Sequence, residues 1–122
     1  MLSLAGCRVL VLEDEPLVAF DYADELEARG AHTDVAHDVD AALRSLSEGP
    51  FHFAILDVNI GTDLSWPVAI SMTRKGIPYL LVSGFARRWR LPPGVEPQDC
   101  LEKPIGAHHV ANRVTELVKF AG

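Results

Sequence analysis

The sequence has little cysteine, a shortage of basic residues and no long apolar run, and each shortage excludes a class of protein. Its 122 residues include two cysteines, Cys7 and Cys100. That is too few for the disulfide framework of a small secreted domain, so we expect reduced thiols in a cytoplasmic protein. Lys and Arg number 11 against 17 Asp and Glu, a formal net charge of −6, which argues against nucleic acid or a membrane as a partner. A membrane-spanning helix needs roughly 20 apolar residues in succession, and the sequence has no such run.

One short stretch departs from this acidic balance. Residues 86–90, "ARRWR", combine three arginines with Trp89, a mixture that also occurs in segments that bind nucleic acid. Because the stretch is short and the whole chain is acidic, we favour an exposed helix face or a contact with a protein partner.

What the sequence does contain is enough apolar material for one core. Hydrophobic residues make up 48% of the chain, and a chain of this length suits one compact domain and leaves little room for another. We therefore expect residues 1–122 to form a single domain without an output domain.

Short apolar segments alternate with helical patterns along the chain. Strands are expected at residues 8–12, 32–36, 51–56 and 79–83 and within 99–104, and helices after Pro16, after Asp38, near 66–75, briefly within 84–98, and from about residue 110. Residues 59–65 are expected to form a loop. Such alternation predicts an α/β fold with a parallel sheet covered on both faces. Right-handed crossovers favour a flavodoxin-like, doubly wound (βα)5 sheet with strand order 2-1-3-4-5.

Polar residues gather where the predicted strands end. Glu13 and Asp14 follow the first strand, Asp57 the third, Ser83 ends the fourth, and Lys103 lies at the end of the fifth. In this fold, ligands bind beyond the carboxyl ends of the strands, at the switch between strands 1 and 3. The sequence therefore predicts one site built from all five side chains.

The chemistry of these residues favours phosphoryl transfer. Three crowded carboxylates repel one another and either hold protons or bind a cation, and Mg²⁺ is the cation that suits a few carboxylates and several waters. The central carboxylate, Asp57, is the natural nucleophile and would form an acyl phosphate. Lys103 would supply positive charge, and Ser83 would donate its hydroxyl to a phosphoryl oxygen.

The chain contains four motifs, "LEDEP", "AILDVN", "LLVSG" and "LEKP". In their order and their separations, these motifs resemble those of the receiver domain of bacterial two-component response regulators. The resemblance implies that Asp57 is the phosphoacceptor. It implies that Asp14 contacts Mg²⁺ directly, that Glu13 does so through water, and that the backbone carbonyl of Asn59 is a further metal ligand. It also makes Ser83 the switch hydroxyl and Lys103 the site lysine, with a cis peptide bond between Lys103 and Pro104.

A narrower likeness lies in "PYLLVSGF", residues 78–85, which resembles the PFxFATGY pattern of the FAT GUY receivers. This likeness implies a stand-alone response regulator that accepts a phosphoryl group from a histidine kinase of the HWE or a related type. It would signal to a downstream protein by direct contact or by phosphorelay. Such a protein is not an enzyme in the ordinary sense, because it catalyses only its own phosphorylation and dephosphorylation.

One position departs from the family. Receivers usually carry Tyr or Phe three residues before the lysine, where the ring rotates inward on activation, and this chain has Cys100 there. We therefore hypothesise that Phe85, or the whole loop 84–97, transmits the signal instead. The departure also keeps open an alternative, a receiver-like adaptor that is never phosphorylated.

Two further interpretations are weaker. A phosphatase of the haloacid dehalogenase type needs a second Asp two residues after its nucleophile, and this chain has Asn59 there, which cannot exchange a proton. Taken singly, each site residue also has a plainer explanation, such as acids that favour a helix dipole or a turn after a strand. The convergence of all five favours a functional site.

Overall fold

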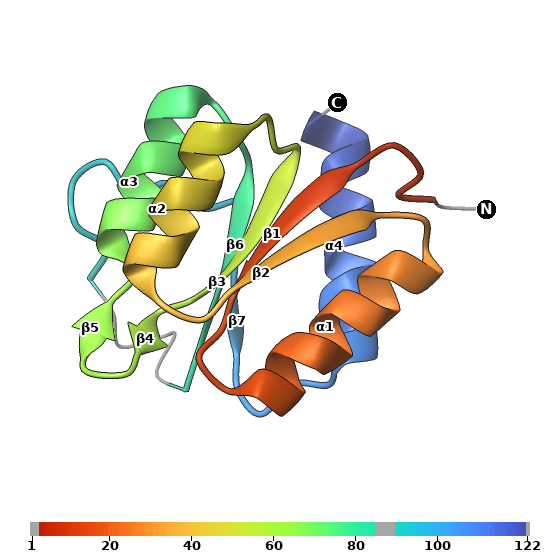
Figure 1. Cartoon of the computed structure of the whole chain (residues 1–122), viewed down its shortest axis with the longest axis horizontal. Helices are drawn as coiled ribbons and strands as arrows, with labels where there is room; N and C mark the ends of the chain where they lie inside the picture. The colour runs from red at the N-terminus through yellow and green to blue at the C-terminus, as the bar shows by residue number, and fades with distance from the viewer. Residues whose placement is uncertain (1–2, 85–89, 122) are drawn as a thin grey trace.

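A five-stranded parallel sheet runs through the middle of the protein in the computed structural model, which describes residues 3–84 and 90–121 (Figure 1). The sheet order is β2-β1-β3-β6-β7, which confirms the predicted 2-1-3-4-5 order when the five strands of this sheet are counted along the chain. These strands are β1 (Arg8–Leu12), β2 (His32–Ala36), β3 (Phe53–Asp57), β6 (Tyr79–Ser83) and β7 (Asp99–Glu102). The helices are α1 (Pro16–Ala28), α2 (Val39–Glu48), α3 (Trp66–Lys75) and α4 (Ala107–Ala121). The fold is the α/β, flavodoxin-like arrangement that the sequence predicts.

Within the described residues, two helices cover each face of the sheet (Figure 1). Alternate residues of β1 enter different cores, because successive side chains of a strand point to opposite faces. Leu10 and Leu12 pack with residues of α2 and α3, whereas Val9 and Val11 pack with residues of α1 and α4. The central strands are therefore buried on both sides, as their continuous apolar runs predict.

The helix ends have local causes in the sequence. Pro16 occupies the first turn of α1, where its missing N–H costs nothing. The Asp38 side chain accepts a hydrogen bond of 2.7 Å from the amide of Ala41 and caps α2. Gly76 ends α3 with a φ of 70°, a left-handed conformation that glycine adopts without strain.

A small hairpin stands where the sequence predicted a loop. Strand β4 (Asn59–Ile60) pairs antiparallel with β5 (Asp63–Leu64). Gly61 opens the two-residue turn with a φ of 60°, and no described residue other than glycine has a positive φ, which identifies a type II′ turn. The prediction of a loop for 59–65 was wrong here because two-residue strands are too short to give a period-2 pattern.

Other expectations are met in part. Residues 90–98 contain no helix, and the remainder of the segment expected to hold a short helix, including Phe85, lies outside the described residues. Cys7 and Cys100 are free thiols, and both are half-buried. None of the helices in the described part of the chain has the length and hydropathy of a membrane span.

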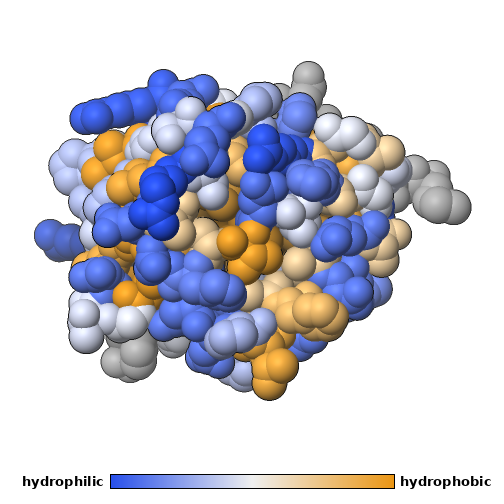
Figure 2. Space-filling model, in the orientation of Figure 1, coloured by the Kyte–Doolittle hydropathy of each residue, from blue (hydrophilic) through white to orange (hydrophobic). Residues whose placement is uncertain are grey.

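Apolar surface is concentrated along α1 and the neighbouring edge strand β2, on the face that Figure 2 shows. Leu17, Phe20 and Val35 are the large exposed side chains of this region.

Candidate functional site

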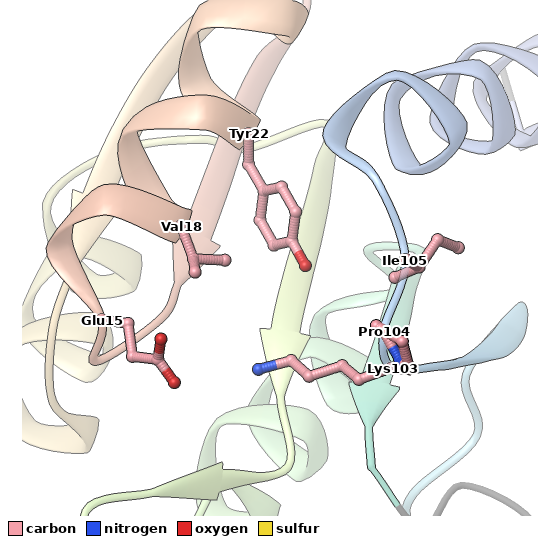
Figure 3. A pocket seen from close by; sticks show the side chains of 6 residues that line it. All are labelled: Glu15, Val18, Tyr22, Lys103, Pro104 and Ile105. Carbon is pink, nitrogen blue, oxygen red and sulfur yellow. The ribbon is translucent and has the colours of Figure 1, made fainter.

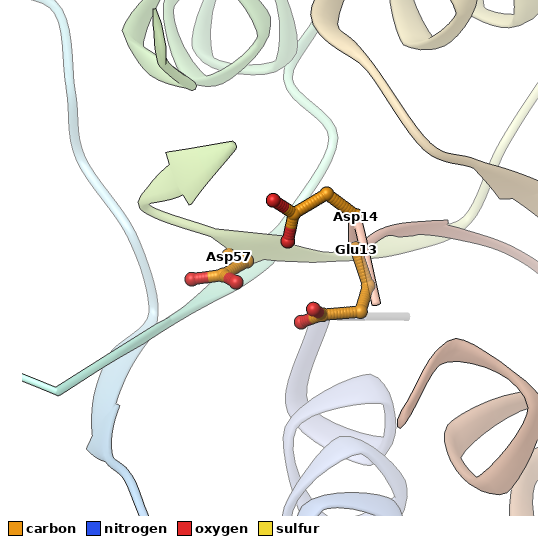
Figure 4. A group of neighbouring side chains, drawn as sticks. All are labelled: Glu13, Asp14 and Asp57. Carbon is orange, nitrogen blue, oxygen red and sulfur yellow. The ribbon is translucent and has the colours of Figure 1, made fainter. Parts of the chain in front are cut away.

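The five predicted site residues all lie at the carboxyl edge of the sheet. Glu13 and Asp14 follow β1, and Asp57 is the last residue of the adjacent β3. Ligand oxygens of these three carboxylates lie within 4.8 Å of one another, and Figure 4 shows the carboxylates converging on one space. Glu13 and Asp57 are buried, so the cluster is partly shielded from water.

The ammonium of Lys103 also lies in this cluster. Lys103 directly follows β7, the last strand in the sheet order. Its Nζ donates to Oδ2 of Asp57 at 2.9 Å and to Oε2 of Glu13 at 3.3 Å. The backbone N–H of Lys103 also donates to the carbonyl of Ser83 at 2.9 Å, which holds the start of the lysine loop against the end of β6. The peptide bond between Lys103 and Pro104 is cis, as the family resemblance implies.

The pKa of the Glu13 carboxyl group is shifted upward by its surroundings in the site. Its side chain is fully buried, and this burial raises its pKa to about 7. A hydrogen bond from the Glu15 amide lowers the pKa, the charge of Asp57 raises it, and the charge of Lys103 lowers it. Ionised Glu13 is therefore costly near neutral pH, and a further cation beside it would relieve that cost.

Burial acts on Lys103 in the opposite direction. It lowers the lysine pKa, but the hydrogen bond and charge of Asp57, together with the charge of Glu13, outweigh it and raise the pKa above its ordinary value. Lys103 is therefore charged at any physiological pH.

Ser83 and Asn59 both lie near the end of β3, where Asp57 stands. Ser83 is buried at the end of β6, the strand that pairs with β3 in a register that places Val82 opposite Asp57. Asn59 is exposed, two residues beyond Asp57. Both are thus near the carboxyl edge, as predicted.

The structure adds contacts that the sequence analysis missed. The amide of Gly61 donates to Oδ2 of Asp14 at 2.8 Å, and Nδ1 of His37 lies 2.9 Å from the carbonyl oxygen of Glu13, to which an imidazole N–H would donate. A two-residue connection that begins with glycine, as Gly61 and Thr62 do here, is only a weak sequence signal for a hairpin when the flanking strands are this short. His37 gives no local signal, because its partner comes from a different strand.

A cavity of about 380 Å³ borders the site between α1 and the loop after β7. Glu15, Tyr22 and Lys103 point into it (Figure 3). Tyr22 is almost fully buried, and this burial raises its pKa to about 12, so its hydroxyl stays neutral beside Lys103.

Cys100 lies on β7, half-buried, and packs against the core that α2 and α3 cover. It pairs in register with Leu81 of β6. A thiol therefore occupies the position for which the family resemblance implies an aromatic ring.

Comparisons with known proteins find the likeness in structure rather than in sequence. No model of a protein family matches the chain, and no curated protein matches it. Solved structures, in contrast, match it along nearly its whole length.

Three of these structures illustrate the likeness. The response regulator TrrA of Thermotoga maritima, solved in complex with Mg²⁺ and BeF, is 22% identical, with a TM-score of 0.77 over 91% of this chain and 98% of that one. The receiver domain of the Francisella response regulator 1452 is 21% identical, with a TM-score of 0.82 over 96% and 100%. The chemotaxis response regulator CheY4 of Vibrio cholerae is 19% identical, with a TM-score of 0.79 over 92% and 98%. The chain therefore has the fold of response regulator receiver domains.

Proposed function

We propose that the protein is a response regulator receiver that accepts a phosphoryl group on Asp57. The observation that carries the proposal is the ammonium of Lys103 at 2.9 Å from Asp57, within a cluster of three carboxylates. Phosphoryl transfer depends mainly on positioning and on charge stabilisation, and this group of residues supplies both. The receiver fold supports the same conclusion.

The residues fit a magnesium ion. Three carboxylates with ligand oxygens within 4.8 Å of one another, one of them buried with a raised pKa, form a site with an excess of negative charge. Hard oxygen ligands of this kind suit Mg²⁺. Glu13, Asp14, Asp57 and the backbone carbonyl of Asn59 would hold the ion, which would neutralise charge on the phosphoryl oxygens when bound.

Three residues of the protein would each have a separate role in the phosphoryl transfer. A carboxylate oxygen of Asp57 forms a bond to phosphorus as the P–N bond of a phosphohistidine breaks, and the electron pair of that bond returns to the imidazole nitrogen. Lys103 would move from ground-state contact with Asp57 to contact with a phosphoryl oxygen. Ser83 would donate its hydroxyl to another.

The finer features of the proposal come from the sequence resemblance. The protein would act as a stand-alone regulator of the FAT GUY type in the cytoplasm, with a histidine kinase of the HWE or a related type as its phosphodonor. It would pass the signal to a separate downstream protein or to a phosphorelay. Its chemistry would be confined to its own phosphorylation and dephosphorylation.

A second candidate, an adaptor that is never phosphorylated, is favoured by one observation. Cys100 stands at the position of the usual switch aromatic, so the common relay from hydroxyl to ring is missing. The phosphorylation experiment described next distinguishes the receiver from the adaptor.

The test is phosphorylation by acetyl phosphate, followed by intact mass spectrometry, with and without Mg²⁺. We expect one phosphoryl group on the wild type with Mg²⁺, none on Asp57→Asn, and none after chelation. The control Asp21→Asn removes an exposed carboxylate from α1 and should be phosphorylated normally. Phosphorylation that persists in Asp57→Asn would reject the acceptor, and a wild type that is never phosphorylated would favour the adaptor.

A further inference from the structure

The tip of the β4–β5 hairpin is bonded to the acidic cluster. The Gly61 amide donates to Oδ2 of Asp14 at 2.8 Å, across 47 positions of sequence. A carboxylate has two oxygens and accepts several hydrogen bonds. Asp14 can therefore bind a cation through one oxygen while the other keeps the hairpin tip in place.

The pairing of the hairpin also bears on the carbonyl of Asn59. The Ser65 amide donates to the Val58 carbonyl at 2.9 Å, and the register then pairs Asn59 with Leu64 and Ile60 with Asp63. Hydrogen-bonded and non-bonded pairs alternate along an antiparallel ladder. The pair of Asn59 and Leu64 is accordingly a non-bonded one, and the Asn59 carbonyl points away from the partner strand.

We propose that this hairpin positions two of the metal's oxygen ligands, and that cation binding in turn fixes the hairpin. Gly61 is a positioning residue that holds the Asp14 carboxylate, while the ladder leaves the Asn59 carbonyl out of cross-strand bonding. The inference rests on the proposed magnesium site and concerns its regulation. Because coupling between two sites is reciprocal, a cation that stabilises the hairpin must bind more tightly when the hairpin is formed.

The coupling reaches a surface away from the cation. Asp63 and Leu64, on the second strand of the hairpin, are exposed. They line a cavity of about 220 Å³ with the beginnings of α2 and α3. Occupation of the acidic cluster would thus be transmitted to this surface by a route that does not pass through Cys100.

The first measurement is backbone amide hydrogen exchange of the wild-type protein, resolved by NMR, with and without Mg²⁺. We expect the amides of residues 60–64 to exchange about fivefold more slowly or better with the ion, at the lower end of typical coupling strengths. Amides at the opposite edge of the sheet, near Gly76, serve as the internal reference and should not change.

The second measurement is magnesium affinity, by titration calorimetry, of two glycine variants, one at the hairpin tip and one remote from the site. Gly61 and Gly76 have φ values of 60° and 70°, and an added Cβ meets no atom within 4 Å at either position. Alanine therefore meets no clash at either position, but it is strained more in the type II′ turn at Gly61 than in the left-handed conformation at Gly76. We expect Gly61→Ala to weaken Mg²⁺ binding about fivefold or more, and Gly76→Ala to bind as the wild type does.

Three outcomes would overturn the inference. If the wild type binds Mg²⁺ but exchange in 60–64 is unchanged, or if Gly61→Ala and Gly76→Ala bind equally well, the hairpin is not coupled and the proposed function stands. If the wild type binds no Mg²⁺ at all, the proposed function and this inference fall together.

Discussion

At the scale of single residues, the ammonium of Lys103 balances the charge of the site. Without it, two buried carboxylates of the cluster would face each other unpaired, and an unpaired buried charge is expensive. We expect Lys103→Met to lower the free energy of unfolding in metal-free buffer by about 2–4 kcal/mol, toward the lower end of the buried-pair range because the lysine is partly exposed. Urea denaturation measures this change.

The double variant provides the control. Asp57→Asn removes one of the charges that Lys103 neutralises, so Lys103→Met should cost less in the Asp57→Asn background than in the wild type. Equal costs in both backgrounds would mean that the two groups are not energetically coupled.

Two buried tyrosines differ in what their hydroxyls bond. The Tyr79 hydroxyl accepts from the Glu96 amide at 2.7 Å and lies 2.8 Å from Oγ1 of Thr73. For Tyr22, no hydrogen bond of the hydroxyl is found within residues 3–84 and 90–121. We expect Tyr79→Phe to cost about 1–3 kcal/mol of stability, because it leaves buried polar groups without a partner.

The matched variant Tyr22→Phe removes the same atom. It should change the free energy of unfolding by no more than about 0.5 kcal/mol, as expected where no interaction is lost. Chemical denaturation of both variants decides the point. Similar losses for the two would show that the hydrogen bonds of Tyr79 contribute nothing specific.

At the scale of elements, the edge strand β2 is attached to β1 by an ion pair as well as by its backbone. Nε and Nη2 of Arg8 bond both carboxylate oxygens of Asp34, at 3.2 and 2.6 Å. This hydrogen bond, followed by the charge of Arg8, holds the pKa of Asp34 below its usual value of 3.8. The pair is partly exposed, so its contribution is modest.

The lowered pKa fixes the sign of a pH dependence. The ionised carboxylate binds better in the folded than in the unfolded chain, so its stabilisation is present above the ordinary pKa and is lost as pH falls through the lowered one. We expect Asp34→Asn to cost about 0.5–1 kcal/mol at pH 7 and to cost little at pH values below the lowered pKa. Unfolding curves at several pH values, with Asp21→Asn as an exposed control, measure this, and a cost that persists unchanged in acid would contradict it.

At the scale of the whole molecule, cation binding should stabilise the fold. The acidic cluster exists only when β1 and β3 are paired, so a cation binds the folded state and not the unfolded chain. We expect Mg²⁺ at about 100 times its dissociation constant to add about 2.7 kcal/mol to the free energy of unfolding. Thermal denaturation over a magnesium titration would show this as a rising midpoint.

The variants of the cluster supply the comparison for that titration. Asp14→Asn removes a charge from the site and should lose most of the magnesium effect, whereas Asp21→Asn should keep it. A midpoint that does not respond to Mg²⁺ in the wild type would contradict a site in the folded protein.

The same scale explains why the site could be predicted from so few residues. Glu13 and Lys103 are 90 positions apart, yet each directly follows a parallel strand. Parallel strands in a doubly wound sheet end at one edge. Knowing which strand each residue follows was therefore enough to predict that Glu13 and Lys103 lie close together.

The sequence by itself determined the five strands of the parallel sheet, the helices α1 to α4 and their order, because apolar periodicity, Pro16, Asp38 and Gly76 act through local backbone preferences, but it did not determine the hairpin of β4 and β5. It also placed acids and a lysine at strand ends. Tertiary structure alone decided that Gly61 bonds Asp14, that His37 contacts the Glu13 carbonyl, and that burial raises the pKa of Glu13. Such contacts and burial depend on the distances between segments far apart in the chain, and no local pattern of residues encodes those distances.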